Sequence, residues 1–148
     1  MRGSGKDGLG GIGKFNFFFL EKFFDPEIDF FVTGFDRIDP ITGRFRFGVT
    51  DEDRAEGQRG LIIIKKIFDE QRHTLIVMDE INSSTDLGIV SEAGVLALLD
   101  QRPPDVELIL TGRNAPASFI ERADLVTDMA IVKHYFYHGV KAREGLDY

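Results

Sequence analysis

Two short, almost continuous apolar runs in the second half of the chain determine the expected fold. They are TLIVMDE at residues 74–80 and VELILTG at residues 106–112. Apolar runs of this length, bounded by turn signals, are typical of parallel strands that are buried on both faces. Each run ends in polar residues, and parallel α/β sheets bind their ligands beyond the carboxyl ends of the strands. We therefore expect two buried strands with a functional site at their ends.

A helical pattern precedes the first of these strands. Thr50 to Asp53 has the form of a capping box, which predicts a helix that continues to about Arg72. Gly57 and Gly60 in its interior each cost roughly 1 kcal/mol relative to Ala. The helix must therefore gain stability by packing apolar side chains on a sheet. The side chains expected to do so are Leu61, Ile64 and Phe68.

The remaining segments complete an alternation of strands and helices. Further strands are predicted at residues 28–35 and 125–134, and further helices at 91–101 and 115–123. Residues 36–48 have the composition of a loop, and FNFFFLEKFF at residues 15–24 is so apolar that other parts of the protein must cover it. Strands that alternate with helices indicate an α/β fold with a mostly parallel sheet.

Composition narrows the possible functions. The 148 residues are 43% hydrophobic, which is enough for one domain with a core. The net charge of -7 and the scattered basic residues argue against nucleic acid as a partner. The absence of cysteine excludes disulfides, a thiol nucleophile and Cys-based zinc sites. No secretory signal opens the chain and no run approaches the roughly 20 apolar residues of a membrane span, so a soluble cytoplasmic protein is expected.

GLGGIGKF at residues 8–15 is a candidate phosphate loop. Gly8, Gly13 and Lys14 fit the spacing G-x-x-x-x-G-K, but Phe15 stands where such a loop has the Ser or Thr that binds Mg²⁺. Lys14 is therefore a candidate phosphate-binding residue. The alternative is a flexible, glycine-rich leader.

Asp79 and Glu80 are candidate metal ligands at the end of the first buried strand. Desolvation makes two adjacent carboxylates costly there unless a cation is present. A Mg²⁺ ion that keeps several waters and bridges phosphates meets this need, as in a Walker B strand. A strand followed by an acidic helix cap is the alternative.

Arg113 follows the second buried strand in the stretch TGRNAP. A guanidinium at this place can bind a phosphate group through two hydrogen bonds. Alternatively, Gly112 makes a tight turn, Arg113 is solvated and Asn114 caps the next helix. Further along, basic and aromatic residues are combined in the stretch VKHYFYHGVKAREG. One interpretation is a tail that closes over a flat ligand or over a neighbouring subunit. The other is an edge strand followed by a solvated tail.

These stretches together resemble the corrinoid adenosyltransferase family of the P-loop type. The resemblance lies in IVMDEIN, QRPPDVELILTGRNAP, ERADLVTDM and IVKHYFYHGVKAREGLDY, which occur in the family's order. LEKFFDPEIDFFVTGF and TDEDRAE extend it upstream, so that it covers about residues 13–148.

The resemblance implies a RecA-like P-loop fold and a specific reaction. The family transfers the 5′-deoxyadenosyl group of ATP to the Co(I) of a corrinoid and releases triphosphate. By position, Asp79 and Glu80 become the acidic pair of the Walker B strand, with Glu80 as the direct Mg²⁺ ligand, and Arg113 becomes a phosphate contact. ATP, Mg²⁺ and a corrinoid are thus the expected ligands, and a homo-oligomer, a dimer, is the expected assembly.

The sequence departs from the family at its start. Members begin with a strand, a P-loop of the type TGxGKGKT, a helix and a second strand, where this chain has about 14 residues. We expect a RecA-like sheet that is N-terminally incomplete, with residues 1–14 as a leader and residues 15–148 as an adenosyltransferase-like domain. Weak ATP binding should follow. The alternative to a transferase is a non-catalytic relative that binds a corrinoid or another subunit.

Overall fold

The computed structural model describes residues 28–35, 41 and 48–140. These residues belong to two compact units, each of which is considered by itself. The first, called the α/β unit here, consists of residues 33–35 and 48–129, and the described part of the second is residues 28–32, 41 and 130–140. The predictions for Lys14, for the segments 1–14 and 15–24 and for the tail beyond residue 140 lie outside the described residues.

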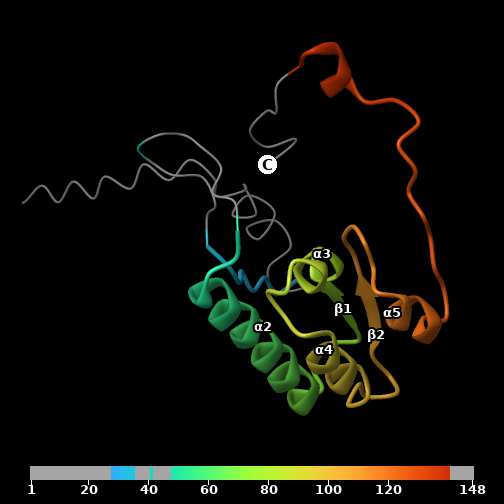
Figure 1. Cartoon of the computed structure of the whole chain (residues 1–148). Coiled ribbons are helices and arrows are strands. Elements are labelled where there is room, and N and C mark those ends of the chain that lie inside the picture. The colour runs from blue at the N-terminus through green and yellow to red at the C-terminus, as the bar shows by residue number, and fades with distance from the viewer. Residues whose placement is uncertain (1–27, 36–40, 42–47, 141–148) are drawn as a thin grey trace, which may run out of the picture. The chain divides into compact units, whose positions relative to one another are not determined.

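A pair of parallel strands forms the centre of the α/β unit. β1 (Leu75–Met78) pairs with β2 (Glu107–Leu110), with Leu75 opposite Glu107 and Met78 opposite Leu110 (Figure 1). Helix α2 (Asp51–Glu70) precedes β1, α3 (Ile81–Asp86) and α4 (Glu92–Leu99) connect the strands, and α5 (Ala117–Arg122) follows β2. The structure confirms the predicted α/β class and the parallel pairing of the strands. It also confirms the predicted helices, which lie at residues 51–70, 92–99 and 117–122. Helix α3 was not among the predicted elements.

The core of the α/β unit lies on one face of this sheet. Its buried side chains come from the helices, the strands and the loops between them: Leu61, Phe68, Met78, Ile81, Val90, Val95, Leu98, Val106 and Phe119. Ile76 and Leu108 pack against this core, whereas their neighbours Leu75, Val77 and Ile109 remain about half exposed. The prediction that both strands are buried on both faces is therefore wrong, because among the described residues the core covers one face only.

The start of α2 is capped as the sequence predicts. The Thr50 hydroxyl accepts a hydrogen bond from the Asp53 N–H at 3.3 Å, and Asp53 Oδ2 accepts one from the Thr50 N–H at 2.9 Å. The helix buries Leu61 and Phe68, and Ile64 packs against the core. Gly57 also has a packing reason, because a Cβ there would lie 2.8 Å from a methyl carbon of Val90. The glycine thus permits a close approach that offsets its cost in helix propensity.

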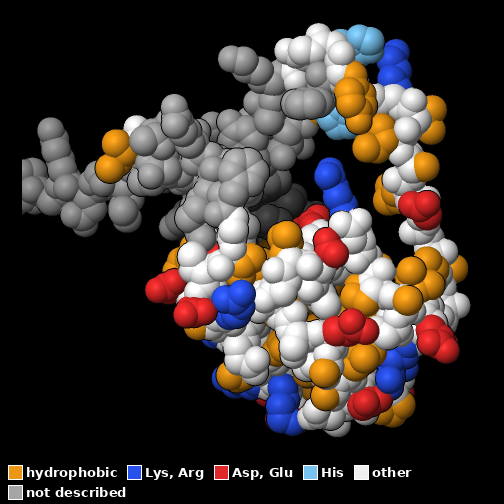
Figure 2. All heavy atoms as spheres, in the orientation of Figure 1, with side chains coloured by type: hydrophobic (Ala, Val, Ile, Leu, Met, Phe, Trp, Pro, Cys, Tyr) orange, Lys and Arg blue, Asp and Glu red, His pale blue; other side chains and the backbone are white. Residues whose placement is uncertain are grey.

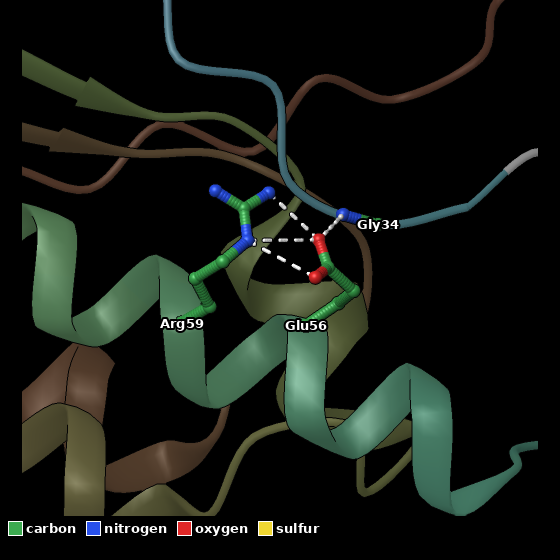
Figure 3. Close-up of polar contacts among 3 residues, drawn as sticks. All are labelled: Gly34, Glu56 and Arg59. Atoms are coloured by element: carbon green, nitrogen blue, oxygen red, sulfur yellow. Dashed lines mark hydrogen bonds and ion pairs between the residues drawn. The ribbon is translucent and has the colours of Figure 1, made fainter.

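Residues 33–35 lie against α2 and do not form a strand. The Gly34 N–H donates a hydrogen bond to Glu56 Oε2 at 3.2 Å, and the Arg59 guanidinium donates to both oxygens of the same carboxylate (Figure 3). These hydrogen bonds, from Arg59 first and Gly34 second, hold the pKa of Glu56 below its ordinary value. The strand predicted at residues 28–35 is wrong, because these residues form no strand and the Gly34 N–H pairs with the Glu56 side chain of α2.

The strand predicted at residues 125–134 is also absent from the described structure. These residues form no regular secondary structure, and the apolar side chains of Leu125, Met129 and Val132 are exposed, as Figure 2 shows for the segment after α5. An apolar pattern makes a strand only where a neighbouring strand offers hydrogen bonds, and no strand pairing involves this segment among the described residues. The next residues form a short 3-10 helix, η1 (Tyr135–His138).

The described helices include none that is both long enough and apolar enough to cross a membrane.

Candidate functional site

Two loops meet where β1 and β2 end. The first carries Asp79 and Glu80 and leads into α3, and the second is formed by residues 111–114. The Thr111 N–H donates a hydrogen bond to the Met78 carbonyl at 3.2 Å, and the Thr111 carbonyl accepts one from the Asn82 N–H at 3.0 Å. The backbone pairing of the parallel strands therefore continues into the loops. The structure brings the two stretches that the sequence singled out to the same edge of the sheet.

The Thr111 hydroxyl fixes the acidic pair from the side of β2. It donates a hydrogen bond to Asp79 Oδ1 at 2.6 Å and accepts one from the Glu80 N–H at 3.0 Å. A hydroxyl has one proton to donate and two lone pairs that accept, so one side chain can serve both neighbours. Thr111 thereby holds the Asp79 carboxylate and the Glu80 backbone together. The Glu80 backbone is left-handed, with a φ of 57°.

The Ser83 hydroxyl makes a second bridge between the same loops. It donates a hydrogen bond to Glu80 Oε2 at 2.5 Å and accepts one from the Arg113 N–H at 2.9 Å. Ser83 was not among the predicted site residues. A small hydroxyl residue three positions after the second carboxylate, at the start of a helix, is the sequence signal that could have indicated it.

Gly112 allows the two loops to lie this close. Its φ is 120°, and a Cβ at this position would be 2.9 Å from both the backbone nitrogen and the hydroxyl oxygen of Ser83. The positive φ of Gly112 and the bend at residues 113–114 turn the chain at the end of β2. Asn114 does not cap the next helix, because its side chain donates to Asp86 Oδ2 at 2.8 Å and the residue before α5 is Pro116.

Three groups of the site form no hydrogen bond with the described residues: one carboxylate oxygen of Asp79, one of Glu80 and the guanidinium of Arg113. Asp79, Glu80 and Arg113 are all exposed. Asp79 Oδ2 and Glu80 Oε1 accept no hydrogen bond from the described residues, and the Arg113 side chain forms no hydrogen bond or ion pair with them. The edge of the sheet thus presents acceptors for a cation beside a donor for an anion.

This donor set fits a hydrated Mg²⁺ ion and does not fit a metal held by protein alone. Among the described residues there is no group of three His, Cys, Asp or Glu side chains that could enclose an ion. Mg²⁺ usually keeps several waters and takes one or two carboxylates together with phosphate oxygens of a substrate. Two hard carboxylate oxygens oriented by hydroxyl groups match that requirement.

The basic and aromatic residues near the C-terminus belong to the second unit. There the ring of His134 lies 4.6 Å from that of Tyr135 and 6.2 Å from that of Tyr137, measured between centroids. Lys133 is exposed, and the Tyr137 N–H donates to the His134 carbonyl at 3.3 Å. This local turn belongs to η1, which follows the segment predicted as a strand.

The fold and the site define an α/β protein that presents two hydroxyl-held carboxylates and an arginine loop at the carboxyl edge of a parallel sheet. The sequence profile of the family described as ATP:corrinoid adenosyltransferase BtuR/CobO/CobP matches residues 19–148. The chain belongs to this family, as the resemblance predicted.

Several curated relatives are named corrinoid adenosyltransferase. The chain is 34% identical over 97 residues to the corrinoid adenosyltransferase of a Sinorhizobium species, and this match covers 65% of this chain and 45% of the relative. It is 33% identical over 96 residues to the Pseudomonas aeruginosa enzyme, covering 65% and 47%. For the Escherichia coli K12 enzyme the identity is 31% over 84 residues, covering 57% and 43%. The chain therefore spans less than half the length of these relatives.

Proposed function

We propose that this chain acts as a corrinoid adenosyltransferase. In this reaction the Co(I) of a corrinoid attacks C5′ of ATP, the cobalt–carbon bond forms, the C5′–O bond breaks, and triphosphate leaves with the electron pair of that bond. The observation that carries the proposal is the family match over residues 19–148, which includes both loops of the candidate site. The side chains of Thr111 and Ser83 hold these two loops together.

The residues of the site suit the handling of a triphosphate. Glu80, with Asp79 beside it, would hold Mg²⁺, which supplies neutralisation of phosphate charge when it is bound. Arg113 would bind a phosphate oxygen, because its guanidinium is exposed and forms no ion pair with the described residues. Thr111 keeps Asp79 in place. Lys14, a candidate for a further phosphate contact by its spacing in the sequence, completes the proposed set.

We further propose the RecA-like P-loop architecture, with residues 1–14 as a leader and residues 15–148 as the adenosyltransferase-like domain. The parallel pairing of β1 and β2 supports it, since this is the arrangement that such a sheet requires. A homo-oligomer is supported by the half-exposed apolar side chains on the open face of the sheet. The use of ATP favours the cytoplasm as its location.

The direct test is adenosylation by the full chain. The purified protein is mixed with ATP, Mg²⁺ and a chemically reduced corrinoid, and formation of the cobalt–carbon bond is followed by visible absorbance. We expect a change that requires the protein and ATP together. Glu80→Gln should slow it by roughly 10-fold or more, because it removes the charge of the proposed Mg²⁺ ligand.

The matched control is Glu121→Gln, which removes an exposed carboxylate from α5 outside the candidate site. It should leave the rate unchanged. If the chain binds the corrinoid but no adenosylated product forms at any ATP concentration, the transferase proposal is wrong and the non-catalytic alternative replaces it. Equal rates for the wild type and Glu80→Gln would remove Glu80 from the site without affecting the reaction itself.

A further inference from the structure

The two hydroxyl bridges of the site differ in what they connect. Thr111 connects the Asp79 carboxylate to the backbone of its neighbour, and it lies at the end of β2. Ser83 lies in the first turn of α3 and connects a carboxylate oxygen of Glu80 to the backbone of Arg113. Ser83 therefore joins the proposed cation ligand and the proposed phosphate-binding loop through one oxygen atom.

The direction of these two hydrogen bonds is fixed by chemistry. An ionised carboxylate only accepts and a backbone N–H only donates, so the Ser83 proton must go to Glu80 and a Ser83 lone pair must face Arg113. No other arrangement satisfies both partners. The bridge thus orients Oε2 of Glu80 and leaves Oε1 without a hydrogen bond from the described residues.

The surroundings of Ser83 support a specific role. Its side chain is partly buried, and Gly112 leaves no room between the loops, since a Cβ there would be 2.9 Å from the Ser83 oxygen. Ser84, the next residue on the same helix, is also partly buried, yet its side chain makes no hydrogen bond with the described residues. The hydroxyl at position 83 therefore makes contacts that its neighbour does not.

We propose that Ser83 is a positioning residue, which sets the Glu80 carboxylate and the Arg113 loop in the mutual arrangement that a metal-bound triphosphate requires. This inference rests on the proposed function, because it assigns Ser83 to the same cation and phosphate site. Residues that orient metal ligands commonly change metal affinity by 10-fold to 100-fold when they are replaced. Loss of the hydroxyl should therefore weaken metal binding more than it weakens the fold.

The experiment uses Mn²⁺ as a paramagnetic probe of the Mg²⁺ site. The full chain is titrated with Mn²⁺ in the presence of ATP, free Mn²⁺ is measured by electron paramagnetic resonance, and the Mn²⁺ that the same ATP binds without protein is subtracted. Ser83→Ala should raise the Kd for Mn²⁺ by about 10-fold. Ser83→Thr retains the hydroxyl and should recover most of that affinity. Ser84→Ala is the matched control and should bind Mn²⁺ as the wild type does.

Two further measurements separate positioning from general damage. The Kd for ATP without metal and the melting temperature should change little in Ser83→Ala, whereas a purely structural residue would alter them as much as it alters Mn²⁺ binding. Hydrogen exchange of the Arg113 amide, followed by NMR without any ligand, should become faster in Ser83→Ala and not in Ser84→Ala. This second measurement tests the bridge independently of the metal.

The outcomes distinguish the two proposals. If Glu80→Gln weakens Mn²⁺ binding but Ser83→Ala does not, the proposed metal site stands and the role of Ser83 is wrong. If Glu80→Gln and the wild type bind Mn²⁺ equally, the metal site itself is wrong and the role of Ser83 is lost with it. Unchanged exchange of the Arg113 amide in Ser83→Ala would show that the bridge does not form in solution.

Discussion

Among single residues, Gly112 determines how closely the two loops of the site approach. Its φ of 120° strains any residue that has a Cβ, and that Cβ would also collide with the backbone nitrogen and side-chain oxygen of Ser83. Gly112→Ala should therefore lower the free energy of unfolding by at least about 2 kcal/mol, measured by urea denaturation. It should also separate the Ser83 hydroxyl from the Arg113 N–H.

Gly88 provides the matched control for this substitution. It also has a positive φ, of 71°, but a Cβ there would meet nothing within 4 Å. Gly88→Ala thus measures backbone strain alone, which costs about 1 kcal/mol. Equal losses of stability in the two variants would mean that the close approach at Ser83 does not exist in solution.

The residues of the site were predictable from the sequence to different extents. Asp79, Glu80 and Arg113 could be placed at one edge because each directly follows an apolar run, and parallel strands bring such ends together. Ser83 could not be found in this way, since its importance depends on a hydrogen bond to a residue 30 positions away. Contacts of that kind follow from the register of the sheet, which a local pattern does not contain.

At the scale of elements, helix α2 was predicted correctly from local sequence features, whereas two strands were not. Its capping box and its buried positions are local features, and both were predicted correctly. The strands predicted at residues 28–35 and 125–134 were wrong, because apolar alternation indicates what a segment would bury and not which partner is available. The burial of β1 was overestimated for the same reason, since an apolar run does not reveal how many faces are covered.

The docking of residues 33–35 on α2 should depend on pH through Glu56. The pKa of this carboxyl is lower in the folded protein than its ordinary value of 4.5, because Arg59 and the Gly34 N–H donate hydrogen bonds to it. Its contribution to stability is therefore complete above pH 4.5 and is lost as the pH falls through the folded pKa. Exchange of the Gly34 amide should accelerate in that range, as NMR can measure.

Glu56→Gln should make the exchange of the Gly34 amide independent of pH across the same range, after correction for the intrinsic rate. Asp69→Asn removes an exposed carboxylate from the same helix and should preserve the dependence. If that variant abolished it as well, the general charge of α2 and not the Glu56 carboxylate would be responsible.

The α/β unit as a whole has a core on one face of its sheet and an apolar surface on the other. Val77 in β1 is 54% exposed, and Val106 beside β2 is 4% exposed, so the two valines sample the two environments. Replacing valine by threonine keeps the shape of the side chain and exchanges one methyl group for a hydroxyl. The same substitution at both positions therefore measures how differently the two faces are buried.

At protein concentrations low enough to keep the chain monomeric, Val77→Thr should change the free energy of unfolding by no more than about 0.5 kcal/mol. Val106→Thr should lower it by about 1–3 kcal/mol, because a buried hydroxyl loses its hydrogen bonds to water. Urea denaturation measures both. If Val77→Thr proves as costly as Val106→Thr, the open face is covered in solution. A cost that rises with protein concentration would identify a second copy of the chain as the cover, since only an intermolecular contact responds to concentration.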